Sequence, residues 1–192
     1  MRSILTAIAQ INLLTWLWIF VVVFSIHELE EWNILSWYRR NYVDLPPSTD
    51  KATRVWIIFI ILVALVWCAA GTLPGNPVLA AYLLLPAVAI AMQNAIQHVY
   101  WQFYFKQYAP GIITAIFGLI PLGICLFVGA VWQRLVPIWY AGFLVILVVP
   151  GLVQTVKAKN MMTPQIRAIH HLGIKLAALL ERVAKRVVSA HP

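Results

Sequence analysis

Long apolar runs separated by short polar connections make up most of the chain. Five of these runs are long enough to cross a bilayer as helices, which takes about 20 residues each. We predict membrane-spanning helices over residues 4–27, 53–71, 77–100, 111–132 and 136–156. The predicted fold class is therefore all-α, a polytopic membrane helix bundle with about five transmembrane helices.

The end of the chain follows a different pattern, in which apolar residues recur every three or four positions among basic ones. Thr163, followed directly by proline, is a typical start for such a helix. We therefore divide the chain into a transmembrane bundle, 1–160, and a cytoplasmic or interfacial amphipathic helix, 161–192. Lying on the inner leaflet is typical of a basic amphipathic helix. The alternative is a heptad-like seam that joins two chains into a homo-oligomer. We place His170 and His171 on its polar side.

The composition agrees with this pattern and excludes a soluble globular protein. Of the 192 residues, 62% are hydrophobic and only 10% are charged, whereas soluble domains carry about 25% charged residues. The net charge of +8 indicates a bilayer with anionic lipid as the partner. Nucleic acid is excluded, because no basic cluster in the sequence is interleaved with stacking aromatic residues.

The basic residues are distributed unevenly among the connections between spans. The first connection and the tail hold most of them, and the second connection holds none. Lysine and arginine favour the cytoplasmic side of a membrane protein. We therefore expect a multi-pass protein of the plasma or inner membrane with its N-terminus outside and its C-terminus in the cytoplasm.

A cluster of ionisable residues interrupts the apolar pattern at the end of the first span. On a helix, His27, Glu30 and Glu31 point broadly the same way, because positions i, i+3 and i+4 share a face. Glu28 is turned about 100° away from His27, and we expect it to face water. A carboxylate at membrane depth costs a few kcal/mol unless a metal, a proton or a cation compensates it. The cluster therefore predicts a partner elsewhere in the chain.

The third span supplies that partner. Asn94 and His98 are spaced i, i+4 and form a polar stripe near its end. In a five-span topology the first and third spans run in the same direction, so this stripe and the His27 cluster lie at one depth. We expect the two helices to meet there, near the cytoplasmic boundary. The Tyr108-Ala109-Pro110-Gly111 turn follows, with a proline placed to begin the fourth helix.

The order and spacing of these residues resemble a known family of small membrane proteins, the HXXEE family. Its three motifs are matched by His27-x-x-Glu30-Glu31, Asn94-x-x-x-His98 and Tyr108-x-Pro110-Gly111. The resemblance covers roughly residues 10–150 and leaves out the basic tail. The family is described without an assigned function, so the resemblance supports the choice of residues and implies no reaction.

Imidazoles and carboxylates at one depth favour a divalent metal site, with zinc or iron as the metal. We predict as its ligands His27, Glu30 and His98. Glu31 would act as the general base, Asn94 would orient a ligand or stabilise an oxyanion, and Tyr108 would act as a donor at the cytoplasmic mouth. The predicted function is hydrolysis of a lipid or another apolar substrate by a metal-activated water.

Two alternatives use the same residues without a metal. In the first, a His–Glu pair performs acid/base isomerisation or cyclisation of a sterol- or terpene-like substrate. The aromatic side chains near the cluster, Trp32, Trp37, Tyr100, Trp101 and Tyr104, would then stabilise a carbocation, although an interfacial aromatic belt explains them more simply. In the second, the protein is not catalytic. The glutamates then pair with Arg39, Arg40 or Asn94 in a structural network, or conduct an ion or a proton.

Overall fold

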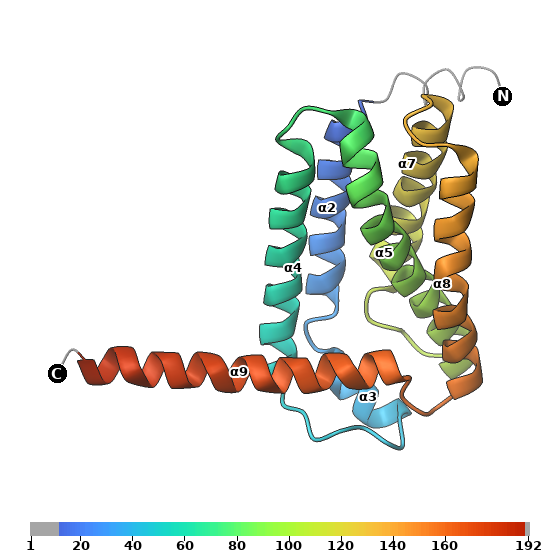
Figure 1. Ribbon diagram of the computed structural model, residues 1–192. Coiled ribbons are helices and arrows are strands. Elements are labelled where there is room, and N and C mark those ends of the chain that lie inside the picture. The colour runs from blue at the N-terminus through green and yellow to red at the C-terminus, as the bar shows by residue number, and fades with distance from the viewer. Residues whose placement is uncertain (1–11, 191–192) are drawn as a thin grey trace.

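The computed structural model describes residues 12–190, which form an upright helical bundle with one long helix lying across its end (Figure 1). The elements in chain order are α2 Leu13–Glu30, α3 Ile34–Asn41, α4 Asp50–Thr72, α5 Pro77–Phe105, α6 Ile112–Thr114, η1 Ala115–Leu119, α7 Ile120–Trp132, α8 Ile138–Ala158 and α9 Pro164–Ala190. No strand occurs among the described residues, so the predicted all-α class is confirmed.

Five helical segments of the described chain are long and apolar enough to cross a membrane, as predicted. They are α2, α4, α5, the continuous segment formed by α6, η1 and α7, and α8. The first span ends at Glu30, later than its predicted end at residue 27, so the polar cluster belongs to the last helical turn. Residues 4–11 of that prediction lie outside the described residues.

Polar side chains fix where three of these helices begin. Asn12 caps α2, Thr49 caps α4 and Asn76 caps α5, each accepting a hydrogen bond from a backbone N–H of the first turn at 3.0–3.1 Å. Such caps satisfy donors that have no partner within the helix. The positions at which these three spans begin are therefore set by local sequence.

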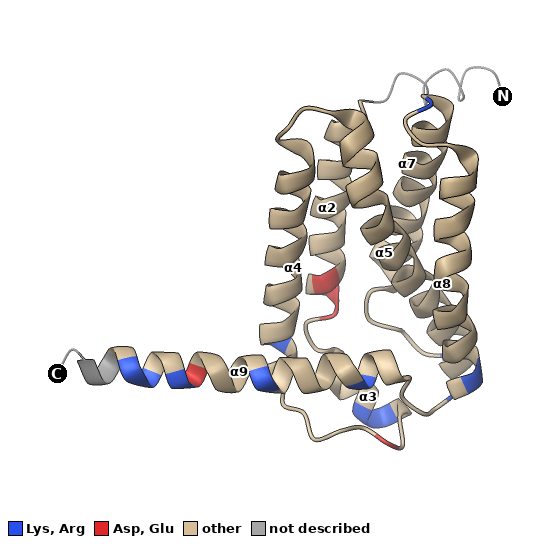
Figure 2. Cartoon of the chain, viewed as in Figure 1, with Lys and Arg blue, Asp and Glu red and all other residues tan. Residues whose placement is uncertain are grey.

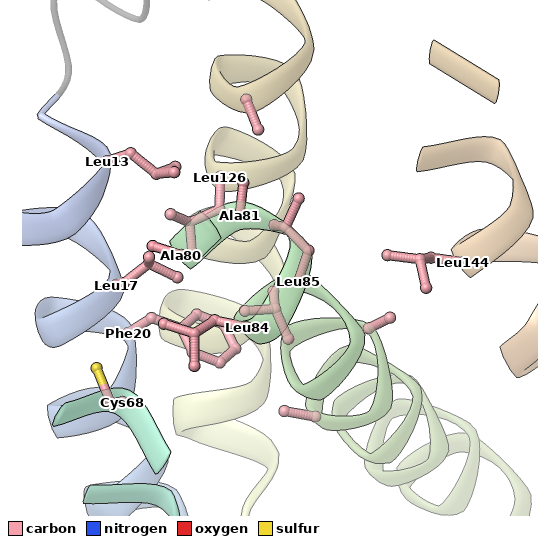
Figure 3. Packing of buried hydrophobic residues seen from close by; sticks show 14 of the residues in the cluster. Leu13, Leu17, Phe20, Cys68, Ala80, Ala81, Leu84, Leu85, Leu126 and Leu144 are labelled. Carbon is pink, nitrogen blue, oxygen red and sulfur yellow. The ribbon is translucent and has the colours of Figure 1, made fainter. Parts of the chain in front are cut away.

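Helix α5 lies in the middle of the bundle (Figure 1). Its small residues Ala80 and Ala81 are fully buried and face leucines of α2 and α7 (Figure 3). Small residues let helix backbones approach closely, which is the main source of packing energy between helices in lipid. The close contact between α2 and α5 brings the two polar motifs together.

The fourth span changes its winding in its first half. Ala115–Leu119 form a π-helix between α6 and α7, two residues before Pro121, whose missing N–H cannot continue the α-helical ladder. This segment lies against α2, because a Cβ at Gly118 would come within 2.5 Å of Val23 Cγ1. The start of the fourth span is thereby held beside the last turns of α2.

Helices α3 and α9 lie at one end of the bundle, which we call the basic end. Lys and Arg residues occur on these helices and on the adjoining ends of α4 and α8, and the acidic residues of α2 lie just above them (Figure 2). The predicted C-terminal helix is present, and Thr163 Oγ1 accepts from Ile166 N at its start.

Helix α9 packs firmly against the bundle. A Cβ at Gly173 would lie 2.9 Å from the backbone oxygen of Ala52 in α4. Lys51 Nζ pairs with Glu181 Oε1 at 2.6 Å, and Gln165 donates to Gln154 of α8 at 2.6 Å. The first half of α9 is therefore a wall of the bundle, and its second half extends past α4 (Figure 1).

Candidate functional site

Two histidines and one glutamate converge at the basic end, between α2 and α5. Glu31 Oε1 lies 3.2 Å from His27 Nε2 and 2.9 Å from His98 Nε2. The exposed fractions of His27, His98 and Glu31 are 0%, 1% and 9%, so water compensates none of them well. One ligand atom from each residue lies within 4.8 Å of the others, which is the spacing of a metal-binding group.

The hydrogen bonding of this group is incomplete. Glu31 Oε1 and both ring nitrogens of His98 are buried and have no hydrogen-bond partner of good geometry among the described residues. Buried polar atoms are almost always paired, because an unpaired one costs about 1–3 kcal/mol. Two imidazole nitrogens and a carboxylate oxygen directed at one place are the donor set that zinc and non-haem iron take. The residues present therefore fit a divalent metal.

A second layer of contacts orients His27. Its Nδ1 lies 2.8 Å from Thr114 Oγ1, and that hydroxyl donates to Glu30 Oε2 at 2.6 Å. With the proton on Nδ1, the ring donates to Thr114 and leaves the lone pair of Nε2 available to accept a hydrogen bond or to bind a metal. This is the arrangement that commonly fixes the tautomer of a metal-ligating histidine. Asn94 Nδ2 lies 3.1 Å from the same Nε2, so Asn94 lies beside the two histidines.

Glu30 lies apart from the two histidines. Its carboxylate accepts from the backbone N–H groups of Ile113 and Thr114 at 3.2 and 3.0 Å, and from the Tyr108 hydroxyl at 2.5 Å. These N–H groups open the fourth span, where a negative charge stabilises the helix end. The sequence predicted Glu30 as a ligand and Glu31 as the base, whereas the structure places Glu31 with the histidines and Glu30 on α6.

Tyr108 supports Glu30 and does not reach the site itself. Its side chain is half exposed and lines a small separate pocket with Glu30, to which neither histidine nor Glu31 contributes. Burial, together with the hydrogen bond to Glu30, raises the pKa of Tyr108 to about 12, so it remains a donor at neutral pH. The geometry makes it a positioning residue, where the sequence predicted a donor at the mouth.

Gly111 is the residue of the third motif that contacts the two histidines. Gly111 has φ +88°, and a Cβ there would lie 2.7 Å from His27 Cε1 and 3.1 Å from His98 Cε1. Only glycine combines a left-handed backbone conformation with so close an approach to two rings. The turn at Gly111 therefore packs directly against both imidazoles, and all three motifs meet at one place.

A cavity of about 670 Å³ adjoins the site and is lined mainly by apolar residues of α2, α4, α5, α8 and α9. Glu31 and Asn94 form part of its polar end, so the site opens into it. Several of its lining residues are also exposed on the outer surface of the bundle, among them Val63, Trp67, Ile90 and Leu147. The cavity is therefore open on a face that the bilayer would cover.

Glu28 and His170 also line this cavity, and the sequence interpretation of both was wrong. Glu28 is only 8% exposed and faces the cavity, not water. His170 is buried against Tyr38 at a ring distance of 5.4 Å, while its neighbour His171 is exposed. Burial, and then the adjacent His171, lower the pKa of His170 to about 4. The sequence did contain a signal for the burial of His170, because His170 lies four residues after Ile166 and therefore on the apolar face of the helix.

Two of the aromatic residues near the cluster lie in the interior of the protein. Trp37 and Trp101 are fully buried, with ring centroids 5.2 Å apart, and Trp101 also packs against His98 at 4.8 Å. A simple interfacial belt does not describe these two residues. They pack next to the site, where Trp101 contacts the His98 ring and Trp37 contacts Trp101.

In the non-catalytic alternative the glutamates pair with Arg39, Arg40 or Asn94, but Arg39 has other partners, and Arg40 shares only a small pocket with Glu30. Arg39 lies 4.0 Å from Asp50 and donates to the backbone oxygen of Ser48. In the described part of the chain, the ion pairs of the α2 cluster join Glu31 to His27 and His98 alone. In the structure, histidines and not arginines therefore compensate Glu31.

The fold and site together define a polytopic helical membrane protein with a buried His/Glu/His centre beside an apolar cavity. The chain belongs to the HXXEE family, described as proteins of unknown function with an HXXEE motif, whose sequence profile matches residues 18–126. No curated protein and no solved structure matches the chain. The matched region contains the three motifs and excludes α9.

Replacing Gly111 tests the packing of the site. We expect Gly111→Ala to lower the free energy of unfolding by about 2 kcal/mol or more, because strain at positive φ adds to the clash with His27. Gly75→Ala is the matched control, since Gly75 has φ +68° with nothing within 4 Å of a Cβ. Thermal unfolding in detergent measures both. Equal destabilisation by the two changes would contradict the close contact with the histidines.

Proposed function

We propose that this protein is a membrane-embedded, metal-dependent hydrolase that acts on a lipid or another apolar substrate. The observation that carries this proposal is the convergence of His27 Nε2, His98 Nε2 and Glu31 Oε1 beside a cavity of about 670 Å³. A metal site alone would suit many roles. An apolar chamber that opens toward the bilayer restricts the substrate to one that reaches the site from the membrane.

His27, His98 and Glu31 would hold the metal. Two histidines and one glutamate are the ligands of a common class of catalytic zinc site, which leaves a fourth position for water. When bound there, the metal would supply a water that loses its proton near neutral pH and would polarise a carbonyl group. Thr114 would keep His27 in the ligating tautomer, and Gly111 would hold both rings in place.

Glu28 and Asn94 would act on the substrate. Glu28 lines the cavity one helical turn before Glu31, where its carboxylate would take a proton from the attacking water. The water oxygen would bond to the substrate carbonyl carbon, the ester or amide bond would break, and Glu28 would return the proton to the leaving group. The Asn94 amide would donate to the developing oxyanion. The role of base thus passes from Glu31, where the sequence placed it, to Glu28.

A metal-free isomerase or cyclase is the second candidate. One observation favours it: two carboxylates, Glu28 and Glu31, face the same apolar cavity, and a proton shared between them would provide both an acid and a base. The metal measurement below separates the two candidates.

The basic end supports a membrane orientation. Lys and Arg gather at the end of the bundle that carries α3 and α9 (Figure 2), and such residues favour the cytoplasm. We propose that the site lies near the cytoplasmic surface, in a multi-pass protein whose N-terminus is outside the cell.

Metal content is the first test of the ligand assignment. We expect purified protein to hold about one zinc or iron per chain, and Glu31→Gln and His98→Ala each to reduce its affinity by at least about 100-fold. Glu181→Gln is the control and should keep the metal, because Glu181 is exposed on α9 and pairs with Lys51, away from the histidines. Inductively coupled plasma mass spectrometry after dialysis against a fixed free zinc concentration measures the occupancy. A wild-type protein that takes up no metal would rule out the hydrolase in favour of the second candidate.

The role of Glu28 is tested separately. We expect Glu28→Gln to keep its metal but to lower the rate of p-nitrophenyl palmitate hydrolysis in nanodiscs by about 100-fold or more, because the amide cannot accept the proton. Glu181→Gln, an exposed change on α9, is the control for removal of a carboxylate. Unchanged hydrolysis by the Glu28 variant would exclude it as the base.

Cysteine labelling tests the orientation. Val43 and Leu73 are exposed in connections at opposite ends of the bundle. With Cys68 and Cys125 replaced by alanine, Leu73→Cys should react with a membrane-impermeant maleimide on intact cells, and Val43→Cys should react only after lysis. The reverse pattern would place the site on the outer side.

A further inference from the structure

The polar groups that line the cavity include no cationic side chain among the described residues. They include two carboxylates, those of Glu28 and Glu31, the imidazole of His170 and several side-chain amides. Among the described residues that line it there is no Lys and no Arg. The Lys and Arg residues of this end belong to α3, α9 and the adjoining ends of α4 and α8 (Figure 2), and none of them lines the cavity. The cavity therefore has acceptors and neutral donors but no cationic side chain.

Two of these groups are buried without a partner. Gln97 is 7% exposed and His170 is 5% exposed, and neither Gln97 Nε2 nor His170 Nε2 has a hydrogen-bond partner among the described residues. Gln97 comes from α5, three residues after Asn94, whereas His170 comes from α9. Unpaired polar atoms from two separate helices that line the same cavity indicate a ligand with a complementary polar group.

We propose that the cavity binds an uncharged lipid ester or amide, whose polar group is recognised by Gln97 and His170. The proposal deepens the proposed hydrolase by naming its substrate class, and it rests on the same cavity. The Gln97 amide donates to the carbonyl oxygen of the ligand, and His170 bonds to the hydroxyl or amide group beside it. The hydrocarbon chain lies among the apolar residues of α4, α5 and α8.

The size of the cavity agrees with such a ligand. Its volume of about 670 Å³ lies within the range of roughly 300–1,000 Å³ that is typical of small-molecule sites. Its apolar lining suits a long hydrocarbon chain, and its opening between exposed apolar residues allows entry from the bilayer. A chain that enters sideways can keep its hydrocarbon part in an apolar environment throughout.

An acidic lipid does not fit this cavity. The carboxylates of Glu28 and Glu31 already balance the charge of a divalent metal held at the end of the cavity, and no Lys or Arg lines it, so a phosphate or carboxylate buried there would be an uncompensated charge, which is strongly unfavourable. The low pKa of His170, about 4, means that its imidazole is neutral near pH 7 and supplies no positive charge. An ammonium group offers no acceptor to Gln97 Nε2, and with the metal bound the two carboxylates leave no negative charge to compensate it.

Competition between two matched lipids tests this selectivity. The probe is 1-palmitoylglycerol with a photoactivatable diazirine in its acyl chain, added to the full-length protein in phosphatidylcholine nanodiscs. We expect it to label peptides from α4, α5 or α8, and unlabelled 1-palmitoylglycerol to compete about tenfold better than 1-palmitoylglycerol 3-phosphate. The two competitors share chain and ester and differ only in the acidic group. Equal competition, or labelling confined to other peptides, would overturn the proposal.

Variants test the two recognition residues. We expect Gln97→Leu and His170→Leu each to reduce labelling about fivefold or more, since each removes a hydrogen bond to the ligand. His171→Leu is the matched control, because His171 is the exposed neighbour of His170, and it should label like the wild type. His170→Gln keeps a donor and should recover most of the labelling, which separates recognition from a folding defect. Wild-type labelling in both leucine variants would overturn the assignment.

Metal content measured on the same samples separates this inference from the proposed function. Selective labelling in a protein without metal would leave the ligand class in place and remove the hydrolase. Metal binding together with unselective labelling would leave the metal centre in place and overturn the ligand class.

Discussion

The burial of one carboxylate at the end of a membrane helix is the constraint on which the rest of the site depends. Glu31 is placed between two imidazoles, at 3.2 Å from His27 and 2.9 Å from His98. A charge in such a place is costly unless it is compensated. The helices that carry these three residues must therefore meet at one depth, which is possible because the small residues of α5 allow α2 to approach closely.

The neighbouring motif residues serve this arrangement in different ways. Glu30 accepts hydrogen bonds from the start of the fourth span and from Tyr108, so it ties that span to α2. Thr114 connects Glu30 to His27, and Gly111 lets the turn approach both rings. The three motifs thus bring two imidazoles, a carboxylate, an orienting contact and close packing to a single place.

Much of this was predictable from the sequence, and the limits have a physical cause. Hydrophobic run length fixed the five spans, and the parallel direction of the first and third spans placed His98 beside His27. The sequence could not decide which of Glu30 and Glu31 joins them, because neighbouring residues on one helix differ by about 100° and the helix rotation depends on tertiary packing. Glu28 and His170 were missed for the same reason: the cavity exists only once α4, α5 and α9 are assembled.

The central claim is that His27, His98 and Glu31 bind one metal ion. X-ray absorption at the metal edge of the purified protein tests it most directly, because the spectrum reports the ligands themselves. The account predicts two imidazole nitrogens and one carboxylate oxygen at about 2.0–2.2 Å, with one further oxygen from water, and loss of one imidazole in His98→Ala. A shell of oxygen alone, or one unchanged in that variant, would contradict it.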